Sequence, residues 1–138
     1  MRKCSKRCCG RKCKSFGQLG LEEFISQYIE TALWSTNDES DERGGEPMDA
    51  NYSASDFAPE AMTKMRADAT LFYNANYTLW QMDADDSTAG HDFWLTRNGH
   101  GAGFWDGDYP TNGKELTKRS KKFGEVWLYV GDDGQIYV

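Results

Sequence analysis

The chain has 138 residues, which is the length of one domain with a single hydrophobic core. Hydrophobic residues make up 38% of it, and no apolar run approaches the 18 residues that would span a bilayer. The composition therefore excludes a two-domain enzyme and a membrane protein, and it predicts a soluble one. Seven of the 16 Lys and Arg residues lie in residues 1–14, so nine basic and 22 acidic residues, a net charge of about −13, remain for the rest of the chain.

Residues 1–18 are predicted to be a disordered, basic, cysteine-rich tail ahead of a single domain formed by residues 19–138. The tail lacks the apolar region of a secretory signal, so we expect no export. Its seven cations could contact nucleic-acid phosphates. Its four cysteines could bind zinc, although they lie too close together for the usual pair of C-x2-4-C motifs. These weak candidate metal ligands are Cys4, Cys8, Cys9 and Cys13.

Two helices are expected next. Apolar side chains recur at steps of three and four over residues 19–34, which predicts an amphipathic helix. The acidic residues 35–54, with glycines and a proline among them, predict a mobile loop. A second helix should start just ahead of Pro59 and continue to about Trp80.

The stretch after the second helix has some features of a calcium-binding loop. Asp83, Asp85 and Ser87 alternate as the first ligands of such a loop do. The sixth position requires glycine and is Thr88, and the twelfth requires glutamate and is Trp94. We therefore expect a solvated connection without a metal.

Residues 92–106 contain two aromatic runs around Asn98-Gly99, a dipeptide typical of β-hairpin turns. Residues 125–138 predict a second hairpin with the four-residue turn 131–134. The faces expected for the first hairpin are Phe93, Leu95 and Phe104 on one side, and Trp94 and Trp105 on the other. Those expected for the second are Val126, Leu128, Val130 and Tyr137, against Trp127, Tyr129, Ile136 and Val138.

A short helix with a basic outer face is expected between the hairpins, over residues 114–123. The elements together predict an α+β domain, in which two N-terminal helices precede two β-hairpins that form an antiparallel sheet. Both faces of that sheet would be apolar. Helices, a partner or a second subunit in a homodimer would have to cover the second face.

The segments GHDFWLTRNGHGAGFWD (90–106) and KKFGEVWLYVGDDGQIYV (121–138) resemble a family of small proteins found in phage and prophage genomes and left without an assigned function. The similarity extends through YIETALWST (28–36) and PMDANYSASDFAPEA (47–61). It implies a phage-borne gene that acts in a bacterial cytoplasm. It implies no substrate, cofactor or catalytic residue, and the tail lies outside it.

Few residues are candidates for catalysis, because nucleophile elbows, phosphate loops and dinucleotide motifs are absent from the sequence. His100 with Asp106 is a weak candidate for an acid–base pair, although a histidine beside two glycines is more often exposed to solvent. A small hydrolase that uses this pair is one hypothesis. No cofactor is expected.

The leading hypothesis is a non-enzymatic phage accessory protein that binds a host protein, with carboxylates that mimic the phosphates of DNA. Aromatic side chains, Trp127 and Tyr129 among them, would add binding surface if they are not core. The candidate partner-binding residues are Asp38, Glu39, Asp41, Glu42, Glu46, Asp49, Trp94 and Trp105. In the alternative, a nucleic-acid-associated protein, the tail would bind phosphates together with Lys114, Lys118, Arg119, Lys121 and Lys122.

Overall fold

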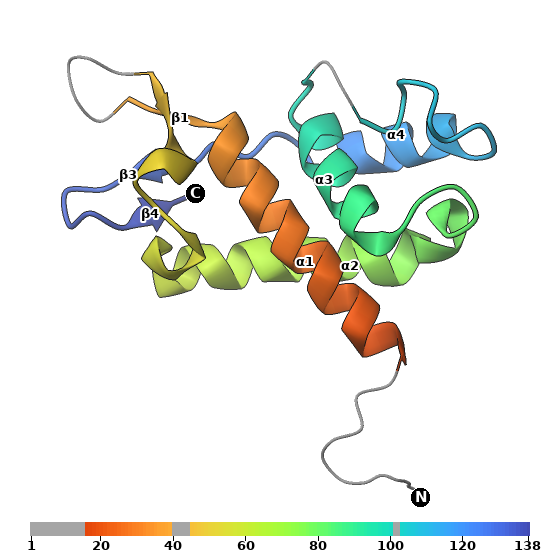
Figure 1. The fold of residues 1–138 in the computed structure, drawn as a ribbon, viewed down its shortest axis with the longest axis horizontal. Helices are drawn as coiled ribbons and strands as arrows, with labels where there is room; N and C mark the ends of the chain where they lie inside the picture. The colour runs from red at the N-terminus through yellow and green to blue at the C-terminus, as the bar shows by residue number, and fades with distance from the viewer. Residues whose placement is uncertain (1–15, 40–44, 101–102) are drawn as a thin grey trace, which may run out of the picture.

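The computed structural model describes residues 16–39, 45–100 and 103–138, which form a mostly helical fold (Figure 1). The α-helices of this part are α1 (Phe16–Ser35), α2 (Pro59–Trp80), α3 (Asp86–Arg97) and α4 (Gly113–Lys121). Its two antiparallel sheets pair β1 (Asn37–Asp38) with β2 (Glu46–Pro47), and β3 (Tyr129–Val130) with β4 (Ile136–Tyr137). Two 3-10 helices, Met48–Ala50 and Ala54–Asp56, precede α2.

The expected α+β class with a four-stranded sheet is wrong. The described strands are two residues long, and they form two separate two-stranded sheets. The first arm of the segment expected to be the first hairpin is helical instead, because α3 extends through residue 97, and the described residues that follow form turns and bends. The aromatic side chains of Phe93, Trp94 and Phe104, which were expected in this sheet, are therefore buried in the helical core.

The ends of α3 explain why this segment folds as a helix. Asp85 caps the N-terminus, where its Oδ1 accepts a hydrogen bond from the backbone N–H of Thr88 at 2.7 Å. At the C-terminus Gly99 has a φ of 73°, and the N–H of His100 reaches back to the carbonyl of Leu95 at 2.9 Å. This is the Schellman arrangement. Asn-Gly supplies the positive φ that both a hairpin turn and a helix cap require, so the dipeptide alone does not distinguish the two.

The helix α3 is buried on almost every side, so its sequence does not alternate between apolar and polar residues with the 3.6-residue period that predicts a helix. All residues from 92 to 98 are buried, because α1 packs along one side of the helix and α4 along another. Gly90 lets α1 approach so closely that a Cβ at this position would collide with the carbonyl oxygen of Phe24. A fully buried helix has no polar face, and short apolar runs of this kind are ambiguous between helix and strand.

The first two helices are confirmed, with α1 and α2 close to their expected bounds. Their apolar stripes meet at a core of stacked rings. The ring of Phe72 lies 4.0 Å from that of Phe93 and 5.9 Å from that of Trp80, and Phe24 stacks on Trp80 at 5.3 Å. Such aromatic contacts add to the burial of apolar area.

The C-terminal hairpin is present, but its expected faces are wrong. The N–H of Gly131 donates to the carbonyl of Gln135 at 2.8 Å, which leaves a three-residue loop closed by Gly134 with a φ of 78°. One loop residue fewer than expected shifts the register, so that Val130 faces Ile136. The resulting faces are Val126, Leu128, Val130 and Ile136 toward the interior, and Trp127, Tyr129 and Tyr137 on the other side.

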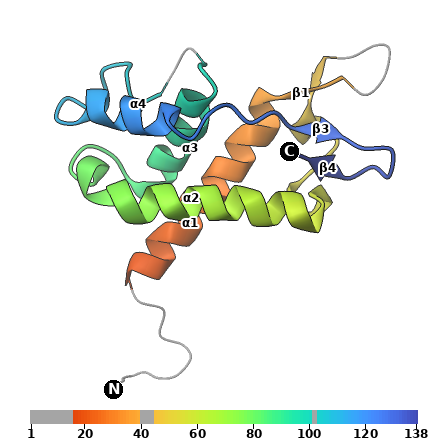
Figure 2. The same ribbon diagram turned by 180° about the vertical axis from the view of Figure 1, so that it is seen from behind.

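The two ends of the domain differ. Both small sheets lie together at one end, and α4 lies at the other, with α1 crossing α2 between them (Figure 1). The view from behind shows the same separation (Figure 2).

Candidate binding groove

A groove of about 500 Å³ lies at the end of the molecule that carries the two sheets. It runs between β1, the C-terminal end of α3 and the extended segment that leads into β3. Its floor consists of the buried side chains of Met48, Trp94 and Leu128, and its rim includes Glu39 and Trp127. The volume falls within the range of ligand-sized pockets.

The floor of the groove is held by hydrogen bonds. The indole N–H of Trp94 donates to Ser35 Oγ at 2.9 Å, and its ring packs edge-on against Tyr28. The side-chain amide of Asn98 donates to the carbonyl of Trp94 at 3.0 Å, and its Oδ1 accepts from the N–H of Val126 at 2.8 Å. Trp94, a predicted partner-binding residue on one face of a sheet, is thus a core residue of α3 that supports the groove.

Exposed aromatic side chains border the groove. Trp127 is 62% exposed and Tyr129 56% exposed, and Tyr129 stacks on Tyr137 at 5.8 Å. The hydroxyl of Tyr137 donates to Asp133 Oδ2 at 2.6 Å, which lowers the pKa of Asp133 and raises that of Tyr137 to about 12. Trp105, the other predicted aromatic contact, is exposed but lies outside the groove.

Carboxylates gather on the β1–β2 side of the groove. Glu39 lies on the rim, and the strand register places Asp38 opposite Glu46. Glu46 also accepts a hydrogen bond from the amide of Asn51 at 3.1 Å, and Asp49 is exposed in the following 3-10 helix. Two further predicted members of this cluster, Asp41 and Glu42, lie outside the described residues.

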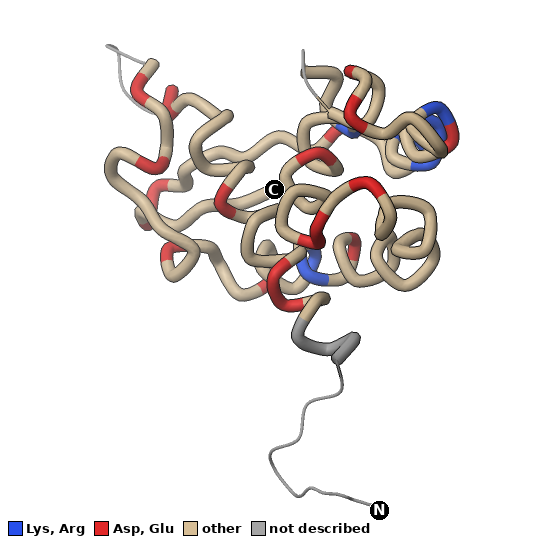
Figure 3. Tube along the Cα trace, turned by 45° about the vertical axis from the view of Figure 1, so that its right-hand side comes forward, with Lys and Arg blue, Asp and Glu red and all other residues tan. Residues whose placement is uncertain are grey.

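Basic side chains lie elsewhere. In the described ranges, every Lys and Arg belongs to α2, α3 or α4 or directly follows α4, and none lines the groove. Figure 3 shows the cluster of cations on α4 against acidic positions spread over the remaining trace. The groove therefore has a negative electrostatic environment.

The predicted phosphate-binding residues share the outer face of α4 and its C-terminal end. Arg119 is engaged by the protein itself, because its Nε donates to Glu115 Oε2 at 2.7 Å and its Nη1 donates to Asn76 Oδ1 at 2.8 Å. The hydrogen bond from Arg119 lowers the pKa of Glu115. The remaining predicted cations, Lys114, Lys118, Lys121 and Lys122, are exposed.

The predicted pair of His100 and Asp106 is not brought together. His100 lines the groove, whereas Asp106 accepts a weak hydrogen bond from the N–H of Gly103 at 3.4 Å. Within the described chain, no hydrogen bond or ion pair joins the two side chains. The geometry does not support a hydrolase built on them.

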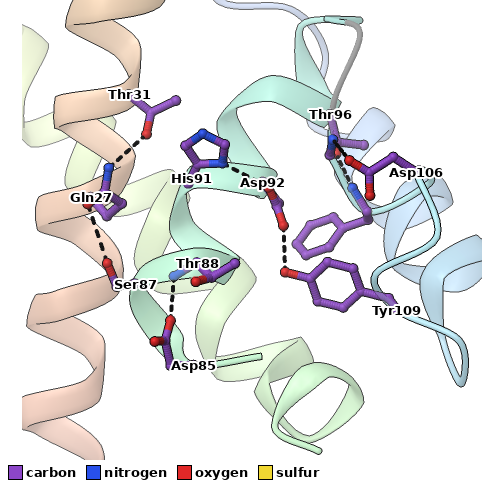
Figure 4. Close-up of polar contacts among 12 residues, drawn as sticks. Gln27, Thr31, Asp85, Ser87, Thr88, His91, Asp92, Thr96, Asp106 and Tyr109 are labelled. Atoms are coloured by element: carbon purple, nitrogen blue, oxygen red, sulfur yellow. Dashed lines mark hydrogen bonds and ion pairs between the residues drawn. The ribbon is translucent and has the colours of Figure 1, made fainter. Parts of the chain in front are cut away.

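A different histidine has a carboxylate partner (Figure 4). His91 Nδ1 lies 2.8 Å from Asp92 Oδ1, and the hydroxyl of Tyr109 donates to Asp92 Oδ2 at 2.6 Å. Burial raises the pKa of Asp92, against the opposing effect of these hydrogen bonds. The nearby hydroxyl of Ser87 donates to Gln27 Oε1 at 3.3 Å, so it is not positioned as a nucleophile activated by His91. The sequence shows His91 beside Asp92 but gives no signal for Tyr109.

Comparison with known protein families, with curated proteins and with solved structures finds no match to this chain. Over the described residues, no group of three or more His, Cys, Asp or Glu side chains could hold a metal ion. No helix in those ranges combines the length and apolar character needed to cross a membrane. The candidate zinc ligands Cys4, Cys8, Cys9 and Cys13 lie outside the part that the structure describes.

Proposed function

We propose that this protein works by binding another protein, and that the partner inserts a basic segment into the acidic, aromatic groove. The observation that carries the proposal is that Glu39 lines one side of the groove and the exposed rings of Trp127 and Tyr129 line the other, while no described Lys or Arg lines it. Carboxylates attract Lys and Arg, and exposed Trp and Tyr rings bind the same side chains through cation–π contacts. Trp and Tyr are also the residues most often responsible for binding energy at interfaces.

The class of partner follows from this chemistry. Proteins that bind DNA present Lys and Arg to phosphates, and the carboxylates of the β1–β2 side would take the place of those phosphates. In line with the resemblance to phage-encoded proteins, we place the partner among the DNA-binding proteins of a bacterial host, in its cytoplasm. The protein would then act as an inhibitor that competes with DNA.

The experiment compares three forms of the immobilised full chain in a bacterial lysate. They are the wild type, the double variant Glu39→Gln/Trp127→Ala, and Leu71→Ala, whose side chain on α2 is 62% exposed, as that of Trp127 is. We expect mass spectrometry to find DNA-binding proteins captured by the wild type and by Leu71→Ala but not by the double variant. Duplex DNA should displace them. Capture that is unaffected by the double variant would contradict the proposal.

A second candidate function is supported by α4. Its exposed lysines, together with Lys122, form a cationic face that the ion pair between Arg119 and Glu115 leaves open. Such a face would bind nucleic-acid phosphates with an affinity that falls steeply with salt. The variant with Lys118, Lys121 and Lys122 changed to Gln should then lose DNA affinity and show a shallower salt dependence. Unchanged DNA binding would exclude this function.

A further inference from the structure

One wall of the groove is an incomplete strand. Residues 125–130 alternate between exposed and buried, which is the period of an extended segment. Only Tyr129 and Val130 are paired, as β3 with β4. The preceding residues, Trp127 and Leu128, continue the same segment along the groove without a neighbouring strand in the described chain.

The register shows which edge of this segment is open. In an antiparallel pair, every second residue of a strand directs its N–H and C=O groups to the partner strand. Gly131 N donates to Gln135 O, so the residues that bond toward β4 are the odd-numbered ones. The N–H and C=O groups of Leu128 and Val130 therefore point away from β4. Val126 has the same parity, and its N–H is satisfied by Asn98 Oδ1 inside the groove.

The open edge faces β1 across the groove. Both ribbon views place β3 between β4 and β1, and the groove is lined by residues from both sides (Figure 2). The carbonyl of Thr36 accepts a hydrogen bond from Met48 N, so the even-numbered residues of this segment bond toward β2. The backbone groups of Asn37 and Glu39 therefore point away from β2 and form the other edge of β1. Two strand edges thus border one groove.

We infer that the partner's basic segment binds as an extended strand that pairs with Leu128 and Val130. This inference rests on the proposed function and specifies how the partner's segment binds. An added strand would satisfy the two open backbone positions, and its side chains would alternate between the two faces. Residues on one face would meet Trp127 and Tyr129, and those on the other would meet the apolar floor.

The partner segment should therefore alternate basic and apolar residues over about five positions, the length of the open edge. Lys or Arg would lie against the exposed rings and near Glu39, and Val or Ile would contact Leu128 and Met48. Charge decides against a second copy of this domain as the occupant. Its described cations all lie on the helices α2, α3 and α4 or directly after α4, and a helix cannot supply an extended strand.

The test uses the full chain and a synthetic peptide with alternating Lys and Val residues. Two derivatives carry backbone N-methyl groups, one at the Lys residues and the other at the Val residues. An added strand directs alternate N–H groups toward its neighbour, so one derivative should lose about tenfold or more in affinity while the other changes little. The amides of Leu128 and Val130 should gain protection from hydrogen exchange when the unmodified peptide binds.

Equal binding of both methylated peptides would overturn the strand mode, as would a scrambled peptide of the same composition that binds equally well. In that case, capture that depends on Glu39 and Trp127 would still support the proposed function. Loss of that dependence would remove the proposed function itself. Self-association of the chain that excludes the peptide, observed by sedimentation, would overturn the inference in favour of a second copy.

Discussion

The side chain of Asn98 joins the end of α3 to the open strand, because its Oδ1 accepts a hydrogen bond from the N–H of Val126 at 2.8 Å. Its amide nitrogen simultaneously donates to the carbonyl of Trp94 at 3.0 Å. Both bonds are buried. One amide thus fixes the position of the groove wall relative to the groove floor, although Asn98 and Val126 are 28 residues apart.

Replacing this amide should destabilise the protein. Asn98→Ala leaves the buried N–H of Val126 without a partner, and we expect a loss of about 1–3 kcal/mol in the free energy of unfolding, measured by urea denaturation. Asn51→Ala is the matched control, because Asn51 makes an exposed bond to Glu46 and should lose less than about 0.5 kcal/mol. Equal losses in the two variants would show that the link to Val126 is unimportant.

Arg97 is a buried cation that connects several elements. Its guanidinium donates to Tyr28 Oη at 2.9 Å and to Asp68 Oδ2 at 3.0 Å, and it lies within 5.6 Å of the rings of Phe93 and Phe123. Two further bonds go to the backbone carbonyls that follow α4. Burial raises the pKa of Tyr28 to about 12, against the opposing effect of Arg97.

The variant Arg97→Met should lose about 3–5 kcal/mol, because it leaves Asp68 and two carbonyls without their donor. Arg66→Met removes an exposed ion pair with Glu22, of 2.8 Å, and should lose less than about 1 kcal/mol. Thermal and chemical denaturation of both variants would measure the difference. A similar small loss in both would contradict the structural role of Arg97.

Gly90 is predicted to be intolerant of any side chain. A Cβ here would collide with the backbone carbonyl of Phe24, which cannot rotate away as a side chain can. Gly90→Ala should therefore destabilise the protein by about 1–3 kcal/mol, although alanine favours helices. A stabilised Gly90→Ala variant in chemical denaturation would mean that α1 and α3 are farther apart than described.

The pH dependence of stability should reveal Asp92. Burial raises its pKa in the folded state, against the hydrogen bonds from Tyr109 and His91. The stability contributed by Asp92 is then fully present below its unfolded pKa of about 3.9 and is lost as the pH rises through the raised value. We expect the free energy of unfolding of the wild type to fall relative to that of Asp92→Asn from about pH 4 upward.

Asp85 provides a control of opposite sign. Its hydrogen bond from the Thr88 backbone lowers its pKa, so the stability it contributes is present above the unfolded pKa and is lost as the pH falls through the lowered value. Wild type should therefore gain stability relative to Asp85→Asn as the pH rises toward about 4, and it should lose stability relative to Asp92→Asn above that pH. Urea titrations on both sides of about pH 4 measure the two differences. The same sign in both comparisons would disprove the assignment for Asp92.

The candidate groove was only partly predictable. Glu39 belongs to an acidic stretch that composition alone identifies, and Trp127 belongs to the aromatic run of the predicted C-terminal hairpin. Trp94 was expected beside Trp105 on one face of a sheet and as a partner-binding residue, yet it is a buried residue of α3. The open strand edge at Leu128 was not predictable, because it depends on the register of the hairpin, and a change of one loop residue alters that register.

Local signals, namely apolar periods, caps and turn residues, were sufficient to predict α1, α2, the basic α4 and the C-terminal hairpin. The conformation of residues 92–106 depended instead on tertiary packing. Asn98-Gly99 suits a helix cap as well as a hairpin turn, and the aromatic run before it suits a buried helix as well as a strand. The choice between helix and strand depended on the surface against which the aromatic run could pack. The helix α1 packs closely against α3 at Gly90, and this long-range contact leaves no local pattern in the sequence.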